Sequence, residues 1–170
     1  AKLNNLKQAA KTMNFLTEHG ISSYGELESK LTAVSARRDT AHAEIKRVES
    51  RSAELTLVMK HAGTYRQLKP LYDRYRKSND KEKFLRGHES EIILFEAAAR
   101  ELKRLGAVPL PTTESMKTEL ANLTAEKERL LAEYKAARTE AQEYDTVKQN
   151  VDALLTVPKE QEQQRRHELE

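Results

Sequence analysis

The sequence contains no cysteine and no tryptophan, and aromatic residues of any kind are few. Its 170 residues include three Phe and six Tyr. Without cysteine, neither disulfides nor thiolate metal sites can hold the fold, and a reducing cytoplasm is the expected setting. The low aromatic content argues against a thick globular core.

Long apolar runs, glycine-rich loops and metal-ligand spacings are also missing. No segment approaches the roughly 18 apolar residues that a membrane span needs, so we expect no membrane insertion. The five glycines are isolated, which argues against a phosphate-binding loop. The five histidines never lie one helical turn apart, so we expect no metal, no cofactor and no small-molecule substrate.

Charged residues make up 34% of the sequence, and the formal net charge is only +3. Ala, Glu, Lys, Leu and Arg dominate, as in proteins built from long helices. The segment from Thr64 to Gly87 holds eight Lys or Arg against three Asp or Glu, so the positive charge is concentrated there. The distribution of charge is therefore more informative than its sum.

Two long segments carry apolar residues in alternating steps of three and four, the spacing of a coiled-coil seam. The first, over 23–62, opens with Ser23 and Glu26, which can form a capping box. The second, over 113–157, follows the break around Pro109 and Pro111, is capped by Thr112 or Thr113, and is expected to end at Pro158. The principal seam residues are Leu27, Leu31, Val34, Ile45, Val48 and Leu55 in the first segment, and Leu120, Leu123, Leu130, Tyr134, Tyr144 and Val151 in the second.

The two seams have the same length, which predicts that they pair antiparallel within one chain, with Leu27 beside Val151, Val34 beside Tyr144 and Leu55 beside Leu123. We therefore predict an all-α fold: a long antiparallel coiled-coil hairpin with a short-helix cap at its tip and an N-terminal helix. The expected parts are a single domain over 1–158, with the N-terminal helix at 1–20 and the helical tip at 63–106, and a polar tail over 159–170. Gly20 and Gly106 are expected to end helices in the left-handed conformation. The opening Ala1-Lys2-Leu3 suggests a fragment of a longer protein, and Leu169-Glu170 a vector-derived end.

Basic and tyrosine residues alternate in the predicted tip. Arginine and lysine neutralise phosphates and tyrosine rings stack on bases, so this composition suits binding to a single strand of nucleic acid. Alternatively, the tyrosines fill a core while the basic residues are simply solvated, and this is the interpretation that we favour. No base or metal ligand accompanies the tyrosines, so we expect no catalysis by this chain. The basic tip consists of Arg66, Lys69, Arg74, Arg76, Lys77, Lys81, Lys83 and Arg86 with Tyr65, Tyr72 and Tyr75.

Several strings resemble, in order and spacing, the C-terminal helical region of relaxases, the mobilisation nucleases of conjugative and integrative elements in Gram-positive bacteria. The resemblance covers roughly residues 4–155. Pro70 departs from the relatives, which run helically there without proline. The strings are Asn5-Leu6-Lys7-Gln8-Ala9-Ala10-Lys11-Thr12, Phe15-Leu16-Thr17-Glu18-His19-Gly20-Ile21, Tyr75-Arg76-Lys77, Lys83-Phe84-Leu85, His88-Glu89 to Leu94, Leu110-Pro111-Thr112 and Ala132-Glu133-Tyr134-Lys135-Ala136-Ala137-Arg138.

The resemblance implies a role in DNA mobilisation in the bacterial cytoplasm. It lends no catalytic residue, because the histidine-metal and tyrosine motifs of the nuclease domain have no counterpart in this sequence. The expected function is a non-catalytic accessory module that positions the nuclease on DNA, on transfer-machinery proteins or on a second copy of itself. The alternative is direct nucleic-acid binding through the basic tip.

Overall fold

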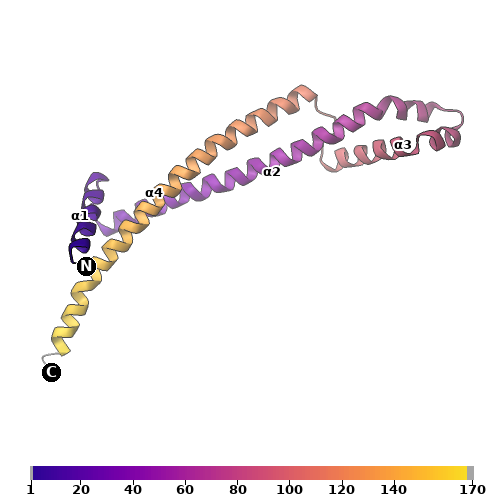
Figure 1. Cartoon of the computed structure of the whole chain (residues 1–170). Coiled ribbons are helices and arrows are strands. Elements are labelled where there is room, and N and C mark those ends of the chain that lie inside the picture. The colour runs from indigo at the N-terminus through magenta and orange to yellow at the C-terminus, as the bar shows by residue number, and fades with distance from the viewer. Residues whose placement is uncertain (1, 168–170) are drawn as a thin grey trace. The chain divides into compact units, whose positions relative to one another are not determined.

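The computed structural model describes residues 2–167, except the side chains at 157–163 and 165–167; Leu169-Glu170 lies outside the described residues. About 90% of the described residues are helical and none is in a strand, which confirms the all-α prediction. The described residues form four helices (Figure 1), which are α1 (Lys2–Glu18), α2 (Tyr24–Lys77), α3 (Lys81–Arg104) and α4 (Thr113–His167).

The chain divides into two compact units, and both long helices contribute to each of them. Unit 1 is Ala1–Glu44 with Leu130–Glu170, and unit 2 is Ile45–Arg129. Each unit therefore contains a stretch of α2, a stretch of α4 and one additional helix. The additional helix is α1 in unit 1 and α3 in unit 2.

In unit 1 the predicted seam forms the core. Leu27, Val34 and Tyr144 are buried in one cluster, and Val151 packs against it, so residues expected to lie side by side share one core. The antiparallel arrangement is also visible in the salt bridge between Arg37 Nη1 and Glu140 Oε2, at 3.2 Å.

The apolar seam of unit 1 does not extend beyond Leu27 and Val151, although the next residues at seam spacing are Tyr24 and Leu155. Tyr24 is 37% exposed and Leu155 is 58% exposed. The Tyr24 hydroxyl donates to Asp152 Oδ1 at 2.6 Å. At this end α2 and α4 are therefore joined by a polar contact.

In unit 2, α2 and α4 are joined by salt bridges beside buried leucines. Arg47 Nη2 lies 2.7 Å from Glu126 Oε1, and Arg51 Nε lies 2.7 Å from Glu119 Oε1. Lys127, a polar interruption of the seam, places its Nζ 3.0 Å from Glu49 Oε1. A long side chain can thus cover apolar surface while its charge stays at the edge. Other buried residues of this unit are Val48, Leu55, Val58, Ala62, Met116 and Leu123.

All twelve principal seam residues are buried or half-buried. Their neighbours Ala41 and Ala137 are 2% and 0% exposed, so the thin layer expected from two small residues lies inside unit 1. The half-buried members of the seam are Leu31, Leu120, Tyr134 and Val151.

Glycine ends α1 and α3 as the sequence predicts. Gly20 and Gly106 have φ values of +63° and +68°. In both, the glycine N–H and the following N–H turn back to bond carbonyls of the last helical turn, for example Ala107 N to Leu102 O at 2.9 Å. This is the Schellman arrangement, and it satisfies carbonyls that the end of a helix leaves without a partner.

The helix starts are capped by side chains. The Ser23 hydroxyl accepts from the Glu26 N–H at 3.2 Å. The Glu26 carboxylate turns back to Ser22, whose N–H donates at 2.7 Å, and not to Ser23 as in the expected capping box. Thr112 Oγ1 accepts from the Ser115 N–H at 3.1 Å, which identifies Thr112 as the cap of α4.

Two predicted helix boundaries are wrong. The helix expected to end at residue 62 continues to Lys77 and includes Pro70, and α4 continues through Pro158 to His167. A proline removes one backbone hydrogen bond and strains the preceding turn, but flanking residues can hold the helix together. Around Pro70 the tyrosines on both sides pack on α3, and after Pro158 the sequence consists of strong helix formers.

Candidate functional site

The three tyrosines of the basic tip face the core of unit 2. The Tyr65 and Tyr72 rings both stack on Phe95 of α3, with centroid distances of 4.8 and 4.2 Å. Tyr75 lies 6.0 Å from the ring of Phe84. Aromatic pairs at these distances stabilise the packing of α2 on α3 beyond the area they bury. The tyrosine rings already have aromatic partners within the chain. This favours the interpretation in which the tyrosines fill the core.

Two basic residues of the tip also have partners inside unit 2. Arg66 donates to Thr113 Oγ1 at 2.8 Å and to the carbonyl of Pro111, so it fixes the start of α4. Lys69 Nζ lies 3.1 Å from Asp73 Oδ2, one helical turn away. These side chains serve local structure.

The remaining six basic residues of the tip surround the connection between α2 and α3. All six are exposed, and none has a carboxylate within 4.0 Å among the described residues. Figure 1 shows the two helix ends that carry them, joined by a short turn. We call this set the cationic turn: Arg74, Arg76, Lys77, Lys81, Lys83 and Arg86.

The helix dipole favours the positions of only three of the six cations in the cationic turn. Arg74, Arg76 and Lys77 lie in the last turn of α2, where cations are favourable against the helix dipole. Lys81 and Lys83 lie in the first turn of α3, where cations are unfavourable. The α3 cap, Asp80, accepts from the Lys83 N–H at 3.0 Å and offsets part of that cost.

The cationic turn can contact phosphates without contacting bases. Exposed arginine and lysine neutralise phosphate charge regardless of sequence, whereas base recognition in single strands depends on accessible aromatic faces. The nearest tyrosines are half-buried and already stacked or tilted against other rings. The stacking part of the single-strand hypothesis therefore has little support in this geometry.

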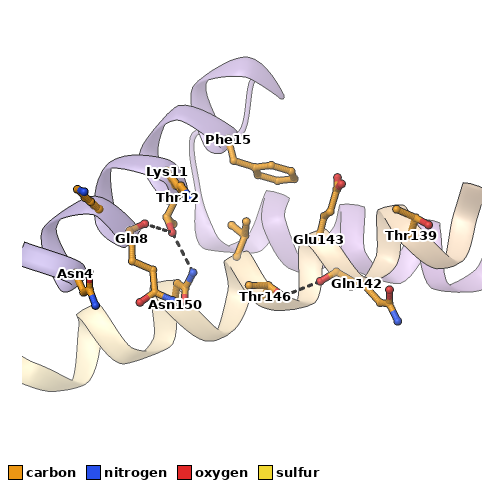
Figure 2. A pocket seen from close by; sticks show the side chains of 12 residues that line it. Asn4, Gln8, Lys11, Thr12, Phe15, Thr139, Gln142, Glu143, Thr146 and Asn150 are labelled. Carbon is orange, nitrogen blue, oxygen red and sulfur yellow. Dashed lines mark hydrogen bonds between the residues drawn. The ribbon is translucent and has the colours of Figure 1, made fainter. Parts of the chain in front are cut away.

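A second feature, which the sequence did not indicate, is a groove of about 710 Å³ between α1 and α4 in unit 1. Figure 2 shows Gln8 and Thr12 of α1 pointing toward Asn150 of α4. Asn150 Nδ2 donates to Thr12 Oγ1 at 3.2 Å, and Thr12 Oγ1 donates to the Gln8 carbonyl at 2.9 Å. Thr12 is 2% exposed, so this polar network is built into the helix contact.

Most of the residues that line this groove are of polar type, including Asn4, Lys7 and Lys11 of α1 and Gln142 of α4, but the surface they present to it is mainly apolar. Phe15 also lines it, with its ring edge-on to Tyr144 at 5.1 Å. Sequence reasoning missed the groove because threonine and asparagine at these spacings match no binding motif. The one available signal was Thr12, a polar residue on the face that otherwise carries Phe15 and Leu16.

Among the side chains that the structure describes, no group of three or more His, Asp or Glu is placed to hold a metal ion. His88 Nδ1 lies 3.1 Å from Glu91 Oε2, one helical turn away. None of the described helices is long and apolar enough to cross a membrane. Comparisons with protein families, with curated proteins and with solved structures gave no match.

Proposed function

We propose that this chain is a non-catalytic interaction module of a DNA-mobilisation relaxase, which positions the nuclease on DNA or on proteins of the transfer machinery. The relaxase context comes from the sequence resemblance alone. The interaction role is supported by the cationic turn, in which six exposed cations lie on two adjacent helix ends without a carboxylate within 4.0 Å in the described chain.

The complete gene product tests the relaxase context. We expect a histidine-metal nuclease motif and a nucleophilic tyrosine upstream of Ala1, and metal-dependent nicking of one DNA strand by the whole protein. Deleting residues 2–167 should leave nicking of a short oligonucleotide intact and reduce mobilisation of a plasmid. Metal-dependent nicking by the isolated chain would contradict a non-catalytic role.

Direct nucleic-acid binding by the cationic turn is the second candidate, and the unfavourable placement of Lys81 and Lys83 at the start of α3 favours it. A charge arrangement that costs local stability is expected where another function requires it. The contact would be to the phosphate backbone, since the tyrosine rings pack inside unit 2. Duplex and single-stranded DNA should then bind with similar affinity.

A salt titration with both forms of DNA tests this second candidate. For each phosphate that the chain no longer neutralises, the variant Arg76→Gln/Lys77→Gln/Lys81→Gln should lower the slope of log K against log salt by roughly 0.9 with duplex DNA and roughly 0.7 with single strands. The matched control Lys60→Gln/Lys103→Gln/Lys117→Gln removes the same charge from exposed positions elsewhere in unit 2 and should bind as the parent chain does. If both variants lost the same DNA affinity, binding would depend on the net charge of the chain and not on the cationic turn. If the chain strongly preferred single-stranded DNA, the tyrosine rings would be the contact.

A further inference from the structure

Helix α1 carries an apolar stripe on its solvent-exposed side. Leu3, Leu6 and Met13 are 67%, 70% and 58% exposed, and Ala10 between them is exposed as well. Their spacing of three, four and three residues is that of a coiled-coil seam. Isolated exposed leucines are ordinary, but a row at seam spacing on one short helix forms a continuous face.

This stripe is not the face by which α1 packs into unit 1. The packing face holds Thr12, which is 2% exposed, together with Phe15 and Leu16, which lie against the core cluster. On a helical wheel at 3.6 residues per turn, the stripe is centred opposite Thr12. Unit 1 therefore uses one side of α1 and leaves the apolar side without a partner among the described residues.

A second, shallow groove of about 200 Å³ lies on the other side of α1, where it packs on α4. None of the stripe residues lines it, and three of its six lining residues are the amides Asn5, Gln8 and Asn150. The stripe is therefore a separate face of α1, which a helix of a partner can cover without entering the contact with α4.

The charges around the stripe are of one sign. Lys2 and Lys7 occupy the two positions that flank the seam, and Lys11 follows one turn later. The only acidic residue of α1 is Glu18, in its last turn. Flanking charges of a coiled-coil seam select partners of opposite charge.

We propose that the Leu3, Leu6, Ala10 and Met13 face of α1 docks an amphipathic helix of a partner protein whose apolar seam is flanked by acidic residues. The proposal extends the interaction role proposed above by naming the chemistry of one partner, but it depends only on unit 1. The partner's apolar seam would cover the exposed side of α1, and its carboxylates would lie beside Lys2 and Lys7.

A second copy of this chain fits the stripe less well. In a parallel pair of α1 helices, Lys2 of one copy would lie beside Lys7 of the other, and like charges at such positions are destabilising. In an antiparallel pair each flank of the seam faces its own counterpart, so Lys7 of one copy would lie toward Lys7 of the other, and the one carboxylate of α1, Glu18, lies five residues beyond the end of the stripe. A membrane surface fits less well too, because interfacial helices present a broad apolar face with aromatic residues, whereas this stripe is one seam wide.

Binding of a labelled acidic peptide to the whole chain tests the proposal. The probe is a synthetic helix of about three heptads with Leu at its seam positions and Glu at the flanking positions. We expect it to bind, and we expect a lysine version of the same helix to bind at least roughly tenfold more weakly, a difference of about 1.4 kcal/mol. Fluorescence anisotropy reads out both peptides.

Variants of the chain distinguish binding at the stripe from nonspecific hydrophobic binding. Leu6→Ser/Met13→Ser should weaken binding of the acidic helix by roughly tenfold or more, about 1.4 kcal/mol for each factor of ten. The matched control Leu131→Ser alters a leucine that is 44% exposed on α4 of unit 1 and should bind as the parent does. Lys2→Glu/Lys7→Glu should reverse the preference in favour of the lysine helix. Circular dichroism checks that each variant keeps its helices.

Several outcomes would overturn the proposal. These are no binding of the acidic helix, equal binding of both peptides, no effect of Leu6→Ser/Met13→Ser, a stripe-dependent dimer by ultracentrifugation, or binding only to vesicles of phosphatidylcholine and phosphatidylglycerol. None of them bears on DNA binding by the cationic turn or on nicking by the whole protein, so failure here is distinguishable from failure of the proposed function.

Discussion

The helices α1 and α3 occupy equivalent roles in the two units, but they are held by different chemistry. In unit 2, α3 buries Ile92, Phe95, Ala98 and Leu102, and the Phe95 ring lies between two tyrosine rings of α2. In unit 1, the only fully buried residue of α1 is Thr12. Unit 2 therefore gains its third helix by burying apolar and aromatic surface, whereas unit 1 combines a small polar network with the half-buried Phe15 and Leu16, which pack against its core cluster.

The difference suggests why α1 and not α3 is suited to a partner. Helix α3 buries four apolar residues within its own unit, at roughly 25 cal/mol per Å² of area removed from water, and its exposed Ile93 and Leu94 are adjacent in sequence and do not form a row at seam spacing. Helix α1 keeps its apolar stripe exposed. The buried polar contact between Thr12 and Asn150 fixes one orientation of α1, as buried polar groups do in some coiled coils.

The largest expected loss of stability comes from removing the Phe95 ring from the aromatic stack of unit 2. Phe95→Ala removes a ring that is 5% exposed and leaves a cavity between Tyr65 and Tyr72. We expect the free energy of unfolding of this unit to fall by about 3–5 kcal/mol, measured by urea unfolding with circular dichroism. The matched control Ile93→Ala truncates a residue of the same helix that is 54% exposed and should change stability by less than about 0.5 kcal/mol. Equal effects of the two variants would mean that α3 is not held by its buried face.

The sequence predicts the features of the two units that depend on local residue patterns. The seam residues of α2 and α4 follow from spacing alone, because a repeat of three and four residues permits one buried side. The glycine ends at Gly20 and Gly106 follow from the conformation that only glycine adopts without strain. These features depend on local rules.

The features that the sequence did not predict depend on tertiary contacts. Helix α2 passes through Pro70 because α3 packs on both sides of it, which no local rule for proline includes. The sequence presents the basic tip as one set of residues. In the structure Arg66 bonds to the start of α4 and the tyrosines pack on α3, while the cationic turn remains exposed. The contact of Thr12 with Asn150 joins residues 138 positions apart, and no local sequence pattern predicts a contact over that separation.

An intermediate effect is expected from the polar network of unit 1. Thr12→Val keeps the volume but leaves the Asn150 amide without one of its acceptors, which should weaken the packing of α1 by about 1 kcal/mol. Thr12→Val/Asn150→Leu removes both polar partners and should recover or exceed the parent stability, so that α1 is then held as α3 is. Hydrogen exchange of the α1 amides measures both.

Thr17→Ala is the matched control for the network, because the Thr17 hydroxyl makes the same bond to the carbonyl four residues earlier but is exposed and contacts no other helix. It should leave the exchange of α1 nearly unchanged. If the double variant were less stable than Thr12→Val alone, the network would be a stabilising element and not chiefly an orienting one.

The smallest expected effect is a difference in acid sensitivity between the units. The pKa of Asp152 is lowered, first by the hydrogen bond from the Tyr24 hydroxyl and then by Lys148. The pKa of Glu26 is lowered by its bonds from Ser22. A carboxylate whose folded pKa lies below its unfolded value stabilises the fold at higher pH and loses that contribution as the pH falls through the folded pKa. Unit 1 should therefore begin to lose this stabilisation as the pH falls below about 4, the ordinary range of carboxylate pKa values, and should lose all of it once the pH has fallen below the lowered pKa values of both groups.

Unit 2 should respond less over the same range. Its one clearly lowered pKa among the described carboxylates is that of Glu101, whose partner Arg104 lies in the same helix, so protonation does not release α3 from α2. Tyr24→Phe should move the pKa of Asp152 back toward 3.8, and an NMR titration of the carboxylates would measure it. If α3 amides lost protection before those of the α2 and α4 stretches in unit 1, the acid-sensitive contacts would belong to the aromatic unit and the contrast between the units would be reversed.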